Sequence, residues 1–508
     1  MNIPRRVLVY IFCSALSIPG LAPKAGAQSR YDSLVSRGAE LAYDAHFNEA
    51  ESLFAEAARL SPERAESFFD VTQIHLWTYT FTQDRKAYNE FKKWYSITLE
   101  KLKTKLDADP ADYRATYLLG ETYMLRSVAG VTAHSYLDAF WSVKSAYSYF
   151  KKTLKLDPDF YDAYRGIGEI HYFLGFIPGS VRWAVGLFGL EPNRAKGLSE
   201  VRLAYQKGNT DRIRATISLA QIYSDYVAEY DSAETLMRVL VDDFPNNPMF
   251  NYNLAVVLIK EHRLHEAEKY LDKVLALNNP DFTVLNNFSL FLKGDVHFKL
   301  NDFSNAIKYN RMFLEKAHQP DYTGIANYRL AVSFRAVGDE AQMRKCLAAA
   351  MHGNQDIYDD ARAKARSEHF LKKGISENEL ATLEAKNDND AGRFEAAYSS
   401  LLPMADKIQD RDTRSEALLV LAEAAAGMRK YAEAARFAAS ADSIDNGESG
   451  WIKPRSWYVA ALSSYHMGDL AAARNYLTRA RDTKEYRSNN ILNELVNGLE
   501  LKVNGEKS

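Results

Sequence analysis

The residues that most resemble a chemical centre are Glu261-His262-Arg263-Leu264-His265-Glu266. Imidazole and carboxylate groups are zinc ligands, so His262, His265 and Glu266 could together hold a metal ion. Catalytic zinc sites of this kind place two histidines four positions apart around a glutamate, whereas these histidines are three positions apart. The six residues also fall where two predicted helices should join. We therefore expect a solvated turn here rather than a metal centre.

Other catalytic patterns are absent from the sequence. It contains no Gly-x-Ser-x-Gly, no Walker-type phosphate loop and no Gly-x-Gly-x-x-Gly. Carboxylates are numerous, but the sequence ties none of them to a partner, so no general acid and base can be assigned. We expect no catalytic residue, no cofactor and no bound metal. An enzyme accessory subunit with its site in the inserted segments stays open as an alternative.

The strongest binding candidate is the apolar segment 173–190, FLGFIPGSVRWAVGLFGL. Pro178 interrupts it, so it is too short to span a bilayer as one helix. It could be an exposed flap that contacts a partner, a ligand or a lipid surface, or a hairpin that folds back onto the core. Arg182, Trp183 and Phe188 are its candidate contact residues.

A degenerate repeat of about 34 residues must position these candidates, and it runs through most of the chain. With Tyr31 as position 1, positions 4, 8, 11, 20, 24, 27 and 32 hold Leu34, Gly38, Leu41, Ala50, Phe54, Ala57 and Pro62. The same positions near the C-terminus hold Leu418, Ala422, Ala425, Ala434, Ala438, Ala441 and Asn446. Small residues let neighbouring helices approach closely, and larger ones fill the gaps between them.

This pattern resembles the tetratricopeptide repeat family, whose unit is a pair of antiparallel helices. The resemblance implies an all-α, right-handed solenoid of helical hairpins, because such a unit buries its apolar face only by stacking. In this family, positions 2, 5, 9 and 12 of the first helix face the concave groove. In the central units these positions include Tyr252, Ile259, Phe291, Asp295, Phe298, Tyr328 and Arg335. Aromatic groups in a groove suit an extended peptide or a short helix, although several of them could pack against adjacent helices instead.

The segment 154–205 carries a closer resemblance. It contains Lys155-Leu156-Asp157-Pro158, Gly166-Ile167-Gly168, Ile177-Pro178 and Gly197-Leu198. These are similar to exported bacterial tetratricopeptide proteins in which a glycine-rich loop splits one repeat, and loosely similar to the tetratricopeptide protein 39 and Iml2 pattern. The resemblance implies a fold and an envelope location but no activity.

The spacing of the repeats predicts two arrays. The first covers 28–351 and has inserts at about 127–141 and 175–192. A charged helical spacer follows at 352–376, then a second array at 377–487, then a capping helix and tail at 488–508. A hinge between the two arrays stays open.

The N-terminus has the pattern of a secretory signal. Arg5 and Arg6 precede the apolar run 7–18, and Ala25-Gly26-Ala27 predicts cleavage after Ala27. Of the two cysteines, only Cys346 lies beyond this signal, so no internal disulfide is expected. We expect Cys346 to be a buried small apolar residue. An exported chain without disulfides suits a bacterial periplasm or cell surface.

Composition narrows the function classes. The chain has 508 residues, of which 47% are apolar, and a formal net charge of −2, so it can build a large core and lacks the basic stripe of nucleic-acid-binding proteins. No later stretch has 18 uninterrupted apolar residues, so no transmembrane span is expected. The leading hypothesis is an exported, non-enzymatic scaffold that binds a protein or peptide partner in its groove or through the insert. A protein that binds a glycan or a small apolar ligand is the alternative, suggested by 31 Tyr and 6 Trp.

Overall fold

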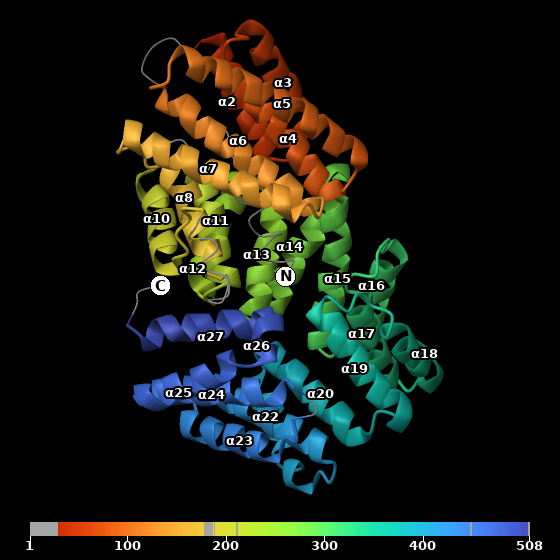
Figure 1. The fold of residues 1–508 in the computed structure, drawn as a ribbon. Helices are drawn as coiled ribbons and strands as arrows, with labels where there is room; N and C mark the ends of the chain where they lie inside the picture. Colours follow the sequence, from red (N-terminus) through yellow and green to blue (C-terminus); the bar gives the residue numbers. More distant parts are fainter. Residues whose placement is uncertain (1–28, 177–185, 187, 210–211, 448–449, 506–508) are drawn as a thin grey trace. The chain divides into compact units, whose positions relative to one another are not determined.

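The computed structural model describes residues 29–176, 186, 188–209, 212–447 and 450–505. Every regular element in these residues is a helix and none is a strand, which confirms the all-α, tetratricopeptide-type fold (Figure 1). By its internal contacts the chain divides into two units. None of the described helices is both long and apolar enough to cross a membrane.

The first unit comprises residues 1–222, 232–251 and 277–284. Its own helices pair in sequence as antiparallel hairpins. They are α2 (Arg30–Tyr43), α3 (Phe47–Leu60), α4 (Glu66–Thr82), α5 (Arg85–Ala108), α6 (Tyr113–Thr132), α7 (Tyr136–Leu156), α8 (Ala163–Leu174) and α10 (Arg194–Lys207). The predicted insert at 127–141 consists of the end of α6, a short turn and the start of α7, so its extra residues lengthen both helices.

The chain passes between the two units in its middle third. The helices there are α11 (Arg212–Asp225), α12 (Tyr230–Asp243), α13 (Pro248–Lys260), α14 (Leu264–Leu277), η2 (Pro280–Phe282) and α15 (Thr283–Lys299). The second unit comprises residues 223–231, 252–276 and 285–508.

The remaining helices belong to the second unit. They are α16 (Phe303–Lys316), α17 (Thr323–Ala336), α18 (Glu340–Ala350), α19 (Tyr358–Lys373), α20 (Glu377–Asp390), α21 (Phe394–Leu401), η3 (Ala405–Lys407), α22 (Arg411–Gly427), α23 (Tyr431–Ile444), α24 (Ile452–His466), α25 (Leu470–Arg481), α26 (Lys484–Ser488) and α27 (Asn490–Val503).

One turn geometry recurs through the described hairpins. A single residue adopts a positive φ, and the N–H of the next residue donates to the carbonyl five residues earlier, as His46 does to Leu41 at 2.8 Å and Lys430 does to Ala425 at 2.8 Å. This is a Schellman-type helix ending, which satisfies carbonyls that the helix leaves free. The residues with positive φ in these turns are Ala45, His134, His262, Asn301, Gly338, Gly392, Arg429 and Gly468.

Small residues let the helices of the first unit approach closely. The ring of Phe150 lies against Gly120, where a Cβ would come within 2.7 Å of it. Gly168 of α8 meets Gly197 of α10 in the same way, because a Cβ on Gly168 would lie 2.7 Å from the Gly197 carbonyl oxygen. Gly168 and Gly197 therefore mark a crossing point of two helix backbones, whereas Gly120 makes room for a ring.

The start of the first unit contacts a later part of the same unit. Asn247 donates to the Tyr43 carbonyl at 2.6 Å, and the backbone N–H of Asn246 donates to Asp44 at 3.0 Å. The rings of Phe47 and Phe282 pack with centroids 5.3 Å apart. The turn between α2 and α3 is thus held by segments more than 200 positions later, as the sequence separation of 204 between Tyr43 and Asn247 shows.

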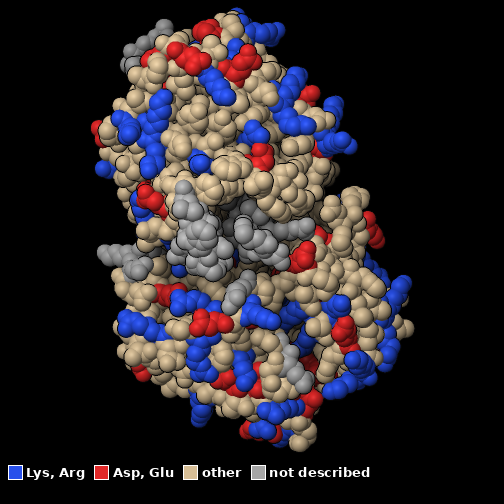
Figure 2. All heavy atoms as spheres, in the orientation of Figure 1, with Lys and Arg blue, Asp and Glu red and all other residues tan. Residues whose placement is uncertain are grey.

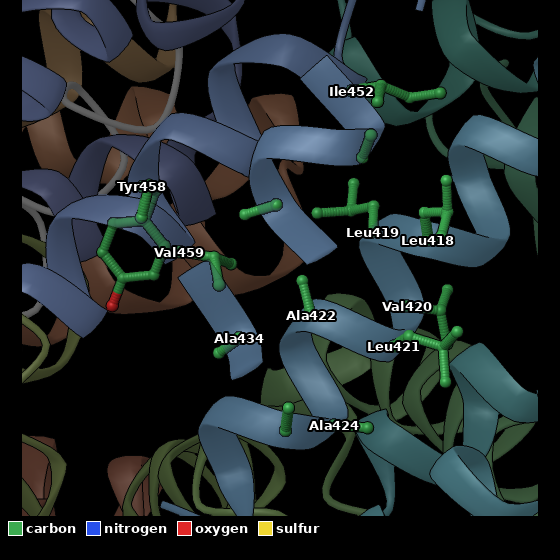
Figure 3. Packing of buried hydrophobic residues seen from close by; sticks show 14 of the residues in the cluster. Leu418, Leu419, Val420, Leu421, Ala422, Ala424, Ala434, Ile452, Tyr458 and Val459 are labelled. Atoms are coloured by element: carbon green, nitrogen blue, oxygen red, sulfur yellow. The ribbon is translucent and has the colours of Figure 1, made fainter. Parts of the chain in front are cut away.

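One apolar cluster of the second unit is centred on α22. Leu418, Leu419, Val420 and Leu421 are all buried although they are consecutive, because helices pack on several sides of α22 (Figure 3). Alanines of α23 and apolar residues of α21, α24, α25 and α27 belong to this cluster. The predicted spacer 352–376 contains α19, and its Phe370 lies in one cluster with Leu347 of α18. The division into two arrays at this spacer stays a prediction. Cys346 is buried in the same cluster, as the sequence indicated.

The last helix, α27, covers the end of this core. Leu492, Val496, Leu499 and Val503 lie in the cluster around α22 and α24. The same helix reaches the start of the second unit, where Gly498 lies so close to the Val227 carbonyl that a Cβ would overlap it.

Candidate partner-binding surfaces

Two surfaces of the described chain are candidates for binding. One is a set of paired charges on helices of the second unit, and the other is an exposed aromatic patch on α7 of the first unit. Positive and negative side chains are otherwise mixed over the visible surface, in keeping with the net charge of −2 (Figure 2).

The paired charges of the second unit lie on the first helices of its hairpins and on α19 and α27. Asp295 of α15 pairs with Arg329 of α17 at 2.7 Å. Four further cation–carboxylate pairs join α11, α13, α19, α22, α24 and α27. These are Arg366–Glu416 at 2.5 Å, Arg455–Glu423 at 2.6 Å, and Lys260 with Asp225 at 2.7 Å and with Glu494 at 2.9 Å. We call these nine residues, together with Lys299 and Asp390, the paired-charge face.

Electrostatic coupling links neighbouring pairs of this face. Burial alone would raise the pKa of Asp390 on α20, but Lys386 and Lys299 outweigh it and lower this pKa to about 2. The charge of Asp390 contributes to raising the pKa of Arg455, and the charge of Glu494 contributes to raising the pKa of Tyr458 on α24. Burial also raises the pKa of Tyr458 to about 12. The charges therefore form one connected network rather than isolated pairs.

In several of these pairs the cation is the more exposed partner. The side chain of Arg366 is 22% exposed against 7% for Glu416, and Arg455 is 28% exposed against 18% for Glu423. Burial would raise the pKa of Glu416, but Arg366 outweighs it and lowers this pKa. The carboxylate of Glu416 thus stays ionised beneath the more exposed guanidinium group of Arg366. Such an arrangement suits a carboxylate or a backbone carbonyl of a bound peptide.

The groove residues predicted from the sequence fall into two groups. Phe291, Phe298 and Tyr328 are buried, at 7%, 8% and 7% exposure. Phe291 packs on Phe313 with ring centroids 5.2 Å apart, and Tyr328 stacks on Phe370 at 6.3 Å. These aromatic side chains therefore pack against adjacent helices, which is the alternative that the sequence left open.

The other predicted residues are polar or lie at the edge of the core. Asp295 belongs to the paired-charge face. Arg335 donates from Nε to the Ile375 carbonyl at 2.8 Å and pairs with Glu377. Tyr252 is half-buried, whereas Ile259 is 9% exposed. The role of all seven residues in partner binding stays a prediction.

Segment 173–190 lies partly outside the described residues. Arg182 and Trp183 are not among them, whereas Phe188 is, and its side chain is 39% exposed. The Phe188 ring meets the edges of Phe140 and Trp141, with centroids 5.3 and 5.5 Å away. The sequence did not predict the contact between Phe188 and α7, because no local pattern shows that a residue 47 positions after Trp141 packs on it.

The histidine motif lies where the sequence predicted a turn. His262 has a positive φ between α13 and α14, and its ring contacts the Asp390 carbonyl at 3.0 Å. His265 and Glu266 instead line a shallow hollow on α14 together with Lys269, Tyr270 and Lys273. Within the described residues no group of three metal-binding side chains converges.

A buried ion cluster in the first unit was not predicted. It joins the first helices of three successive hairpins through Tyr117, Glu121, Arg165, Glu169, Arg214 and Ser218. Arg165 donates to Glu121 at 2.6 Å and to Glu169 at 2.8 Å. The spacing of Arg165 and Glu169 reveals an i, i+4 pair, but their partners on α6 and α11 carry no sequence signal. Two carboxylates and two guanidinium groups cancel in charge, so we assign the cluster a structural role.

Comparison with known proteins gives one family match. Residues 250–281 match a model described as a tetratricopeptide repeat. No protein with a curated description matches the chain. The tetratricopeptide domain of P58(IPK) is similar with 12% identity over 94% of this chain and 100% of that chain, and a TM-score of 0.21. Yeast Tom70 is similar with 12% identity over 93% of this chain and 96% of that chain, and a TM-score of 0.23. The APC/C Cut9–Hcn1 hetero-tetramer is similar with 13% identity over 94% of this chain and 97% of that chain, and a TM-score of 0.24. At these scores nothing about the partners of this chain follows from them.

Proposed function

We propose that this chain, in which residues 250–281 match a tetratricopeptide repeat, is exported and holds a protein or peptide partner on the paired-charge face of its second unit. Repeats of this kind generally mediate protein–protein interaction, because stacked hairpins present an extended surface. The observation that carries the proposal is the uneven exposure of the pairs, in which guanidinium groups such as that of Arg366 lie above more buried carboxylates.

Energetics favour a functional role for these charges. Buried ion pairs contribute little net stability, since the cost of removing both ions from water offsets their attraction, and apolar residues of similar volume often replace them without loss. A surface that keeps several such pairs is therefore better explained by a need to bind polar groups. An extended peptide with acidic side chains or a free carboxylate fits the exposed cations best.

The test uses a charge exchange that preserves a pair while reversing its outward sign. Arg455→Glu combined with Glu423→Arg keeps one positive and one negative group at this position but exposes the carboxylate. The matched control is Arg436→Glu combined with Glu433→Arg, a pair at 3.2 Å on α23 that is not part of the paired-charge face. Each tagged protein would be captured from its native cells after chemical crosslinking.

We expect a protein that is captured with the wild type and the control and is lost with the exchange at Arg455 and Glu423. Circular dichroism and a thermal melt would establish that both variants fold. Equal capture by both variants would remove the paired-charge face from the proposal. Failure of the wild type to capture any protein would remove the scaffold function itself.

Export is tested separately. Fractionation of native cells should place the protein outside the cytoplasm, and N-terminal sequencing should begin at Gln28, as expected for cleavage after Ala27. A cytoplasmic protein that retains residues 1–27 would contradict this part of the proposal and leave the binding test unaffected.

A further inference from the structure

A second surface, on α7 of the first unit, has a composition that the scaffold function does not require. Its apolar side chains are unusually exposed, with Leu137 at 71%, Trp141 at 45%, Tyr136 at 44% and Phe188 at 39%. Most large apolar residues of a folded chain lie in its core, so four that are exposed and adjacent indicate a contact surface.

Lysines continue this patch along the same side of α7. Leu137, Trp141, Lys144, Ser148, Lys151 and Lys155 follow the helical spacing and lie within an arc of about 80°. We call these six residues the α7 stripe. At 1.5 Å per residue the stripe is about 27 Å long. Its N-terminal end is apolar and the rest is cationic.

Two of the three lysines of the stripe, Lys144 and Lys151, contact aromatic rings. The Nζ atom of Lys144 lies 5.1 Å from the Trp141 ring centroid and 5.2 Å from that of Phe188, and Lys151 lies 5.3 Å from the Tyr147 ring. Within the described part of the chain, none of the three lysines forms an ion pair. They are therefore free to meet an anionic surface.

Acidic groups near the stripe already have partners. Asp138 is the one carboxylate on α7 and pairs with Arg126 at 2.7 Å, on another side of the helix. Glu191, whose charge reaches Lys151, pairs with Lys196 at 2.8 Å. The field along the stripe is consequently positive.

We propose that the α7 stripe docks this protein on an anionic lipid bilayer. Tryptophan and leucine with flanking lysines are residues that enter the boundary between headgroups and acyl chains, where the apolar side chains are buried and the amines meet phosphates. A protein partner would need apolar pockets and carboxylates at matching positions, whereas a bilayer offers both chemistries everywhere along its surface. The inference does not rest on the partner proposed above.

The test is sedimentation of the natively purified protein with lipid vesicles. The protein should bind phosphatidylcholine vesicles that contain phosphatidylglycerol, should bind pure phosphatidylcholine much less, and should bind less as salt rises. Changing Lys144, Lys151 and Lys155 to Gln should weaken binding roughly hundredfold, at about 1 kcal/mol for each lysine. Leu137→Ser combined with Trp141→Ser should weaken it roughly tenfold or more.

Matched controls separate the stripe from general charge and apolarity. Lys92, Lys93 and Lys103 are exposed on α5, and their replacement by Gln should leave vesicle binding unchanged. So should Val239→Ser combined with Met467→Ser, since both side chains are 50% exposed elsewhere. Circular dichroism would verify that every variant is folded.

Two results would overturn the proposal. One is failure of the wild type to bind anionic vesicles, and the other is stripe variants that bind as well as the wild type. If stripe variants instead lose a co-purifying protein while no form binds vesicles, the α7 stripe is a protein contact and lipid docking is wrong.

Discussion

At the scale of single residues, the buried carboxyl of Asp70 on α4 gives the sharpest prediction. Its side chain is 1% exposed and neither oxygen has a hydrogen-bond partner in the described structure. Burial, reinforced by Glu66, raises the pKa of Asp70 well above its ordinary value of 3.8. The folded state therefore holds a proton that the unfolded state releases.

The sign of the resulting pH dependence follows from linkage. Because the folded-state pKa is the higher one, this group's contribution to stability is full below pH 3.8 and is lost as the pH rises toward the raised pKa. The loss amounts to about 1.4 kcal/mol for each pH unit in that window. Asp70→Asn should remove this slope and raise the free energy of unfolding at neutral pH, as urea titrations between pH 4 and 7 would show.

Asp360 is the matched control for Asp70. It is also buried, and its pKa is raised to about 6 by burial, but it accepts hydrogen bonds from the N–H groups of Ile325 at 2.8 Å and Asn354 at 2.9 Å. An amide there would turn a donor toward one of these N–H groups. Asp360→Asn should therefore destabilise the protein by roughly 1–3 kcal/mol. A destabilising Asp70→Asn would contradict the view that its carboxyl lacks partners.

The ion cluster of the first unit yields a second prediction at this scale. Glu121→Ala would leave the guanidinium groups of Arg165 and Arg214 buried beside each other without their shared carboxylate. The expected cost is about 3–5 kcal/mol. Arg126→Ala removes an ion pair with Asp138 in which the side chains are 41% and 43% exposed. This change should lower the free energy of unfolding by only about 0–1 kcal/mol. Similar melting temperatures for the two variants would mean that the cluster is hydrated in solution.

At the scale of elements, the recurring hairpin turn makes a paired prediction. Arg429 has a φ of 62° and Gly338 a φ of 81° at the same position of two turns. Side chains are strained in this region by about 1 kcal/mol, while glycine is not. Arg429→Gly should thus stabilise the protein by up to about 1 kcal/mol. Gly338→Ala should destabilise it by a similar amount, although a Cβ there meets nothing within 4 Å.

The hairpins also show how far the sequence alone leads. Small and large residues at fixed positions, such as Gly38, Ala50 and Phe54, predict helix pairs because they report contacts within one unit and with its neighbour. His262 likewise identifies a turn. The pairs Arg366–Glu416 and Arg165–Glu121 join residues 50 and 44 positions apart, and any nearby charge would have fitted equally well. Partner choice among charges depends on the superhelix geometry, which no local pattern contains.

At the scale of the whole molecule, the cap α27 should govern the stability of the second unit. Deleting residues 489–508 would expose the surfaces that Leu492, Val496 and Leu499 cover, at about 2 kcal/mol for each side chain. It would also remove Glu494, one of the two carboxylates that pair with Lys260. We expect a lower melting temperature and faster hydrogen exchange in α13. Ile491→Ser, on the exposed side of the same helix, should change stability by less than about 0.5 kcal/mol.

An unchanged exchange rate in α13 after this deletion would mean that Glu494 and Gly498 do not hold the start of the second unit. The sequence did predict a capping helix within 488–508 but not its contact with Val227 and Lys260. An apolar face at the end of an array predicts that a capping helix covers it. Which distant residues the capping helix contacts depends on the curvature of the array, which the sequence does not show.

These two attachments, of α27 to Val227 and Lys260 and of the turn at Tyr43 and Asp44 to Asn246 and Asn247, fix the number of repeats. An open solenoid can grow by duplication of a unit, because each repeat contacts only its neighbours. Here one extra hairpin between α20 and α25 would move α27 away from Val227 and Lys260. One extra hairpin between α3 and α11 would likewise move the turn between α2 and α3 away from Asn246 and Asn247. These long-range contacts can therefore form only with the present number of hairpins. We expect natural variants to change the lengths of turns and helices while keeping the helix tally.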